Sequence, residues 1–213
     1  MYKGVQRDDE RLGQAGVPSD RVAAQAFSSF DSATIVTVAR DTEVAEPIEI
    51  TVAGPGEGQV AYGHLQIRVE ELSRATVVVD LRGSGILADN VEIVVGDSAG
   101  VGVIWIADWA DDTVHVSSHH ARLGKDAVLR HSAVQLGGAV QVQRPTDQEA
   151  LSVVVVGAGE NDALPRLARQ RPGGVAPQNI DPPVLERLEP LLRRHRHEAD
   201  GVGIVEDRGG HGR

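Results

Sequence analysis

The chain of 213 residues contains no cysteine, which excludes disulfide bonds, thiolate metal ligands and cysteine nucleophiles. Aromatic residues make up only 3% of it, so its core must be built from valine, isoleucine, leucine and alanine. Because such small side chains pack closely, we expect no large pocket. The first thirty residues lack the apolar stretch of a secretory signal, and no run is long enough to span a membrane. We therefore expect a soluble, cytoplasmic protein.

Positive charge is also scarce, and the formal net charge is -10. Nucleic acids and anionic membranes are bound mainly by lysine and arginine side chains that neutralise phosphate groups. The charge balance therefore argues against both kinds of partner.

A repeated pattern is the main positive feature of the sequence. The segments LSRATVVVD, VGDSAGVGVIW and LGKDAVLRH each place a polar corner and an alanine before a valine-rich alternation. Their alanines, Ala75, Ala99 and Ala127, are 24 and 28 residues apart. A period in this range is typical of stacked units, each of which buries its apolar face against a neighbour.

The alternation of apolar and polar residues predicts short strands from residue 34 onward. The predicted strands are 34–38, 48–52, 62–70, 75–80, 90–95, 100–105, 113–118 and 127–136. Two all-β architectures fit them, a sandwich of hairpins and a parallel β-helix. We favour the β-helix, because hairpin dipeptides such as Asn-Gly are missing and the period fits one coil. Before the strands, Asp20 is placed to cap a short helix through Phe30.

The composition changes at Gly138. All six aromatic residues precede it, seven of the ten prolines follow it, and lysine is absent beyond it. We therefore divide the chain into a lead-in with a short helix (1–33), a β-helix core (34–138) and an atypical tail (139–213). The tail is expected to be poorly ordered or partly helical, and its arginine-, glycine- and proline-rich composition suggests out-of-frame translation.

Several stretches in order resemble one protein family. VARDTEVAEPIEITV, GEGQVAYGHLQIRVEELSRATVVVD and ADNVEIVVGDSAGVGVIWIADWADDTVHVSSHHARLGKDAVLRHSAVQLGG are similar to the central β-helix of the SufB/SufD family of iron-sulfur cluster assembly proteins, in the SufD branch of actinobacterial style. The similarity runs from about Asp8 to Gly138.

This resemblance implies a cytoplasmic, non-catalytic scaffold subunit of the SUF system. Its implied partners are a SufB-like paralogue and a SufC-like ATPase, in a SufBCD complex that handles the iron-sulfur cluster while this chain binds no cofactor itself. Family members also carry a helical N-terminal segment, further coils and a late segment with a histidine implicated in cluster assembly. Nothing after Gly138 matches these, so we expect a fragment and transfer no functional histidine. A β-helix enzyme acting on polysaccharide and a purely structural solenoid are the alternatives.

Four histidines are candidates for a metal site: His115, His119, His120 and His131. Adjacent residues on a strand point to opposite faces, so His119 and His120 cannot share an ion, and His115 lies about 13 Å from His119 at roughly 3.3 Å per residue. A site would need His131 from a neighbouring coil. We favour surface or corner histidines and assign no metal ligand.

The other motifs carry no assignment either. The acidic residues Asp108, Asp111 and Asp112 fit a solvated turn better than a cation site. Residues 157–162 only partly match a dinucleotide-binding turn. Asp181 is placed to cap a helix, and Arg193 to His197 form a basic cluster at its end. No serine–histidine–aspartate set or carboxylate pair is evident, so we assign no catalytic or cofactor-binding residue.

Overall fold

The computed structural model of the chain describes residues 2–18, 20–145 and 153–158. The chain divides into two units, Met1–Glu160 and Asn161–Arg213, and all described residues lie in the first. In chain order the described elements are β1 (Tyr2–Val5), α1 (Arg21–Ser29), β2 (Ala33–Val38), β3 (Ile48–Ala53), β4 (Val60–Val69), β5 (Arg74–Gly83), β6 (Ile86–Val95), β7 (Gly100–Trp109), β8 (Val114–Leu123), β9 (Val128–Gly137), β10 (Val140–Pro145) and β11 (Val153–Ala158).

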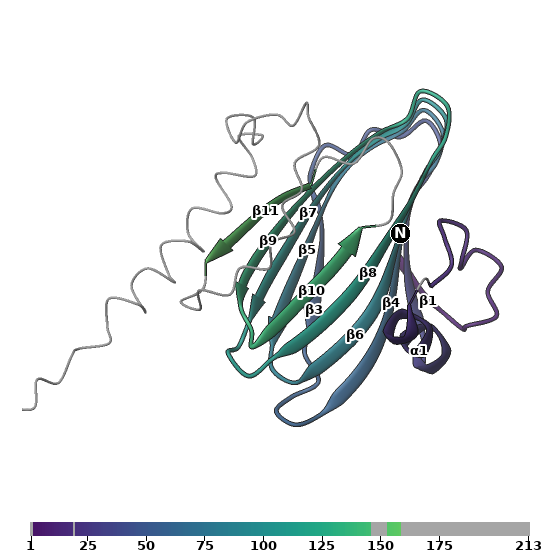
Figure 1. Cartoon of the computed structure of the whole chain (residues 1–213). Helices are drawn as coiled ribbons and strands as arrows, with labels where there is room; N and C mark the ends of the chain where they lie inside the picture. Colours follow the sequence, from purple (N-terminus) through teal and green to yellow (C-terminus); the bar gives the residue numbers. More distant parts are fainter. Residues whose placement is uncertain (1, 19, 146–152, 159–213) are drawn as a thin grey trace, which may run out of the picture. The chain divides into compact units, whose positions relative to one another are not determined.

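The strands form two sheets, and from β2 onward consecutive strands alternate between them (Figure 1). Sheet A has the order β1-β2-β4-β6-β8-β10, and sheet B has the order β11-β9-β7-β5-β3. Of the described strand pairs, only β1 with β2 is antiparallel. Each coil therefore gives one strand to each sheet. The predicted parallel β-helix is confirmed, and the sandwich of hairpins is wrong.

The corner lengths set the length of each coil. The central strands β4 to β9 have ten residues each, and four residues join sheet A to sheet B. The return corner has two residues at 84–85 and four at 110–113, so Val60 pairs with Ile86 after 26 residues and Ile86 pairs with Val114 after 28. Because both lengths are even, every side chain keeps its face from coil to coil.

This register corrects one detail of the predicted repeat. Ala99 and Ala127 do occupy the same corner, and the carbonyl of Ala99 accepts a hydrogen bond from the next coil, at Val128 N (2.9 Å). Ala75, however, pairs with Val101 and not with the position of Ala99. The alignment by alanines was therefore wrong by two residues, since the actual repeat there is 26. An even error leaves the predicted faces unchanged.

The corners between sheet A and sheet B share a left-handed residue. Leu72, Ser98 and Asp126 have φ of 59°, 55° and 55°, and each is the third residue after a sheet A strand ends. Backbone hydrogen bonds tie these corners together, because Leu72 N donates to Asp97 O and Ser98 N donates to Lys125 O. The predicted turns at VGDS and LGKD are confirmed, and their polar residues tolerate this conformation better than leucine does.

Odd-numbered positions of the central strands point between the two sheets and form the main core. As predicted, most of these side chains are aliphatic, for example Val77 and Val79 of β5 and Val91 and Ile93 of β6. Trp105 of β7 is the largest of the fully buried side chains. Burial of such a face against the opposite sheet is the main stabilising contribution to a fold of this kind.

The predicted helix is also confirmed, as α1. The side chain of Asp20 accepts hydrogen bonds from Val22 N and Ala23 N, which satisfies two free donors of the first turn. The helix lies over β4 and β6 on the outer face of sheet A, where Phe27 and Phe30 contact the ring of His64 (Figure 1). No helix in the described residues is long and apolar enough to cross a membrane.

Strand pairing continues beyond residue 138. β10 pairs in parallel with β8, and β11 pairs in parallel with β9. The expected dinucleotide-like turn extends past the end of β11 at Ala158, and the expected helix from Asp181 and the basic cluster at 193–197 lie outside the described residues.

We predict that Gly85→Ala strongly destabilises the fold, whereas Gly102→Ala does not. Gly85 has φ of 107°, and a Cβ there would lie 2.3 Å from the carbonyl oxygen of Gly56. We expect a loss of at least about 2 kcal/mol in the free energy of unfolding, measured by urea denaturation. At Gly102, in strand β7, a Cβ would meet only Thr76 atoms at 3.7 Å or more, so alanine should be neutral or slightly stabilising. Equal stability of the two variants would contradict the close approach of the coils at the corner.

Candidate functional site

A cluster of polar side chains lies between the two sheets, inside the coils. β6 contributes Asp89 to it, and β8 contributes His115, Ser117 and His119 from alternate positions. Asp89 is directly opposite Ser117 in the parallel register. All four side chains are buried. Polar groups in such a place are costly unless they are hydrogen-bonded, so their partners decide what the cluster is.

The hydrogen bonds of the cluster converge on the carboxylate of Asp89. Trp109 Nε1 donates to His115 Nδ1 (3.1 Å), which leaves the proton of His115 on Nε2, 3.2 Å from Asp89 Oδ2. Ser117 Oγ donates to Asp89 Oδ1. Since the serine proton is thus used, Ser117 Oγ accepts from His119 Nε2 at 2.9 Å. The network is consistent with an ionised aspartate and two neutral imidazoles.

His131 extends this cluster from the opposite sheet. It lies on β9, and its ring centroid is 5.2 Å from that of His119. The side chain is 1% exposed, and neither ring nitrogen has a hydrogen-bond partner within the described part of the chain. Burial lowers the pKa of His131 to about 4. Burial and the neighbouring His131 and His115 also hold the pKa of His119 well below its ordinary value. Both imidazoles are therefore neutral at physiological pH.

The expectation of surface or corner histidines was wrong. His115, His119, His120 and His131 are each at most 4% exposed. The reason is that sheet A is covered on both faces, by sheet B inside and by α1 and residues 9–16 outside. The expected opposite orientation of His119 and His120 is confirmed, because His119 contacts the core residue Trp105 whereas His120 lies under Gly16. Over the residues that the structure describes, no group of three His, Cys, Asp or Glu side chains is arranged to hold a metal ion.

A second polar network lies on the outer face of sheet A and is centred on Glu92. Its carboxylate accepts hydrogen bonds from the backbone N–H groups of Gly13 (2.7 Å) and Ala15 (2.9 Å), and one oxygen is 2.7 Å from His64 Nε2. Burial acts to raise the pKa of Glu92, but the hydrogen bonds from His64, Ala15 and Gly13 outweigh it and hold the pKa below its ordinary value. This carboxylate therefore fixes the N-terminal lead-in to the sheet.

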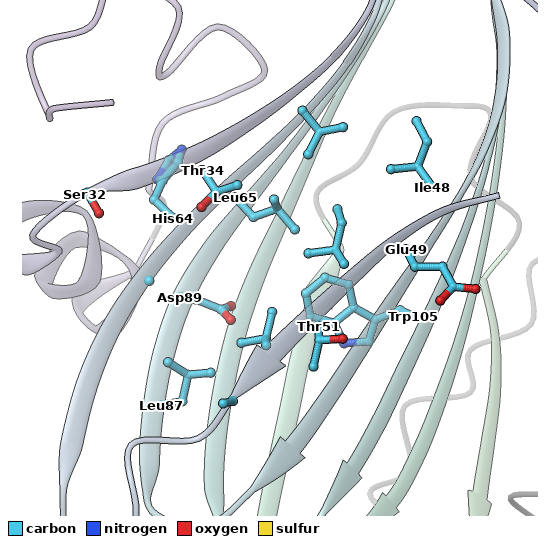
Figure 2. A pocket seen from close by; sticks show the side chains of 15 residues that line it. Ser32, Thr34, Ile48, Glu49, Thr51, His64, Leu65, Leu87, Asp89 and Trp105 are labelled. Carbon is cyan, nitrogen blue, oxygen red and sulfur yellow. The ribbon is translucent and has the colours of Figure 1, made fainter. Parts of the chain in front are cut away.

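A cavity of about 530 Å³ opens beside the interior cluster. Figure 2 shows Asp89 on the sheet A wall and Trp105 on the sheet B wall, with Leu87, Ile48 and Thr51 around them. The cavity lies at the coil of β2 and β3, where β3 is the edge of sheet B and only one further coil follows on that side to fill the space. The expectation of no large pocket was therefore wrong: small side chains fill the closed coils but leave the first coil open.

The interior cluster does not have the geometry of a hydrolase triad. A serine nucleophile needs a histidine base that accepts its proton, whereas Ser117 donates to a carboxylate. Asp111 and Asp112 are exposed at the corner before β8, as expected for a solvated turn. Sequence reasoning missed Asp89 and Ser117, because their meeting depends on a coil of 28 residues that was not known beforehand.

Comparisons with known proteins follow the same part of the chain. Residues 51–150 match the model of the SufBD core domain, described as SUF system FeS cluster assembly. This matched segment belongs to the SufBD family. It contains β4 to β10 completely, including both sides of the interior cluster. No solved structure matches the chain.

Relatives of this SufBD segment occur in mycobacteria. An iron-sulfur cluster assembly SufBD family protein of Mycobacterium bovis is 71% identical over 136 residues, which are 64% of this chain and 34% of that protein. Proteins with the same description are 70% identical in Mycobacterium tuberculosis H37Rv and 65% identical in Mycobacterium leprae, over the same length. The chain thus matches about a third of the length of these relatives.

We predict that the stability of the SufBD segment falls with pH below the ordinary histidine range, partly through His131. The unfolded chain binds a proton at His131 near pH 6.5, whereas the folded chain does so only near 4, so the free energy of unfolding decreases as the pH falls between these values. One such group contributes about 3 kcal/mol over this window.

The test is urea denaturation of wild type and His131→Leu at several pH values. The variant should show a weaker loss between pH 6.5 and 4, and at pH 8 it should lose at most about 1 kcal/mol, because the imidazole it replaces has no hydrogen bond to lose. Identical pH dependence in both proteins would refute the role of His131.

We predict that Glu92→Gln releases the N-terminal lead-in. An amide in place of the carboxylate turns its NH₂ group toward one of the donors Gly13 N or Ala15 N, which costs about 2 kcal/mol. Trypsin should then cut after Arg11 about tenfold faster while the sheets stay folded. Glu57→Gln, at an exposed corner, is the matched control and should leave the cleavage rate unchanged. Unchanged cleavage in both variants would mean that Glu92 does not anchor this segment.

Proposed function

We propose that this chain is a scaffold component of the SUF iron-sulfur cluster assembly system, of the SufD type, acting in the cytoplasm beside a SufB-like paralogue and a SufC-like ATPase. The observation that carries the proposal is the SufBD core match over residues 51–150, which coincides with the coiled two-sheet part of the structure. The cluster is the cargo of the complex and not a resident group of this chain.

The chemistry of the residues supports a scaffold rather than an enzyme. Protein iron-sulfur clusters are held mainly by cysteine thiolates, and this chain has no cysteine. In a complex that builds clusters, the thiolates must therefore come from other subunits. The described serine nearest to histidine and aspartate side chains, Ser117, is engaged as a donor to Asp89 and has no base to activate it.

A β-helix enzyme acting on polysaccharide is the competing function, and the cavity does not favour it. Sugar-binding grooves combine paired carboxylates with aromatic platforms. Trp105 is the one Trp, Tyr or Phe among the described residues that line the cavity, and it is 1% exposed. The carboxylates of the lining, Asp89 and Glu49, come from opposite sheets, and Asp89 is already bound to His115 and Ser117.

We predict that the tagged 213-residue chain co-purifies with mycobacterial SufB-like and SufC-like proteins when the three are co-expressed. Size-exclusion chromatography with light scattering should give one species containing all three chains. Co-expression with each partner alone identifies which of them holds the chain. A folded chain that elutes separately from both partners would contradict the proposal, and release of reducing sugar from oligosaccharides by the purified chain would support the competing enzyme.

A further inference from the structure

An apolar surface lies on the outer face of sheet A, beside α1. It consists of two columns of residues, one at the first position of successive strands and one two residues later. We call these residues the uncovered apolar face: Val60, Ile86, Val114 and Val140 in the first column, and Tyr62, Ala88, Val116 and Val142 in the second. The even coil lengths place them on the same face as His64 and Asn90, which α1 covers.

This face is accessible to solvent. Val60 is 54% exposed, Ile86 is 40% exposed and Val140 is 46% exposed. Four strands at a spacing of about 4.8 Å make it about 14 Å across. Single exposed apolar residues are ordinary, but a contiguous apolar surface of eight residues is typical of a binding site.

The sheet itself limits what can bind here. The β4, β6 and β8 backbones are paired on both sides, so this face offers side chains and no free backbone groups to a partner. An added strand needs such groups, whereas a helix does not. α1 shows how a helix packs on this sheet, because Ala23 and Ala26 are buried against the same face. A helix about 10 Å wide fits beside it.

The charge around the face specifies the flanks of that helix. The corners that precede its four strands are residues 54–59, 84–85, 110–113 and 138–139. They contain the exposed carboxylates Glu57, Asp111 and Asp112 and no lysine or arginine. Opposite charge at the rim of an interface speeds association and selects the partner.

We propose that the uncovered apolar face binds an amphipathic helix of another protein, one with an apolar stripe at positions i, i+3, i+4 and i+7 and lysine or arginine beside the stripe. The inference concerns a surface that neither the interior cluster nor the scaffold role explains, and it stands independently of the proposed function. The apolar stripe covers the two columns, and the basic flank meets the acidic corner.

The test uses two labelled 18-residue peptides with the same leucine stripe, one with lysine flanks and one with glutamate flanks. Fluorescence anisotropy with the full chain should show binding of the lysine peptide that weakens with added salt, and binding of the glutamate peptide weaker by about tenfold or more. Equal binding of the two peptides would overturn the proposal.

Variants locate the binding on this face. Ile86→Lys should weaken the lysine peptide by about tenfold or more, and Val140→Lys, on the neighbouring column position two strands away, should do the same. Val128→Lys is the matched control, because Val128 is equally exposed (53%) but begins a strand of sheet B. Thermal melting checks that each variant is folded.

Two outcomes of these measurements would overturn the proposal. One is unchanged binding by both folded variants of the face. The other is self-association of the wild-type chain in sedimentation velocity that Ile86→Lys abolishes, since a second copy of the chain would then be the partner. Asp111→Asn combined with Asp112→Asn should reduce the salt dependence without abolishing binding, and an unchanged salt dependence would remove the argument for basic flanks.

Discussion

Parallel stacking with an even number of residues per coil is the constraint on which this structure depends. Because the return corner has two or four residues, the register advances by 26 or 28 and never changes the face of a side chain. One position in a strand therefore becomes a column through the whole solenoid. The aliphatic core, the polar cluster of Asp89 and Ser117, and the outer apolar columns all arise from this one rule.

The same rule explains how one strand carries two buried carboxylates. Asp89 and Glu92 are three residues apart on β6, so they point to opposite faces of sheet A. Each has a histidine partner, His115 inside and His64 outside. A buried charge is tolerated only where several donors replace its hydration, and both carboxylates have at least two. The inner one joins neighbouring coils, and the outer one joins the sheet to the N-terminal lead-in.

Sequence reasoning found what depends on local pattern and missed what depends on register. The strands, the turn residues at Ser98 and Asp126, and the cap at Asp20 were predictable, because alternation and local hydrogen bonding are written in neighbouring residues. The burial of His119 and His120 was not, because it requires knowing that sheet A is covered on both sides. The contact of Asp89 with Ser117 was not either, because it depends on the length of the corner at 110–113.

The outer apolar columns differ from the core in what folding requires of them. Strand pairing satisfies the backbone of sheet A, and packing against sheet B buries its inner face, so the fold gains little from valine or isoleucine at exposed positions such as Val60, Ile86 and Val140. Elsewhere on the same outer face, where α1 does not reach, polar residues occur, as at Arg68 and Arg122 near the ends of β4 and β8. β-branched residues do favour strands, but threonine would serve that preference equally and remain soluble. Apolar side chains repeated at one position in four successive coils are therefore better explained by a partner than by the stability of the chain itself.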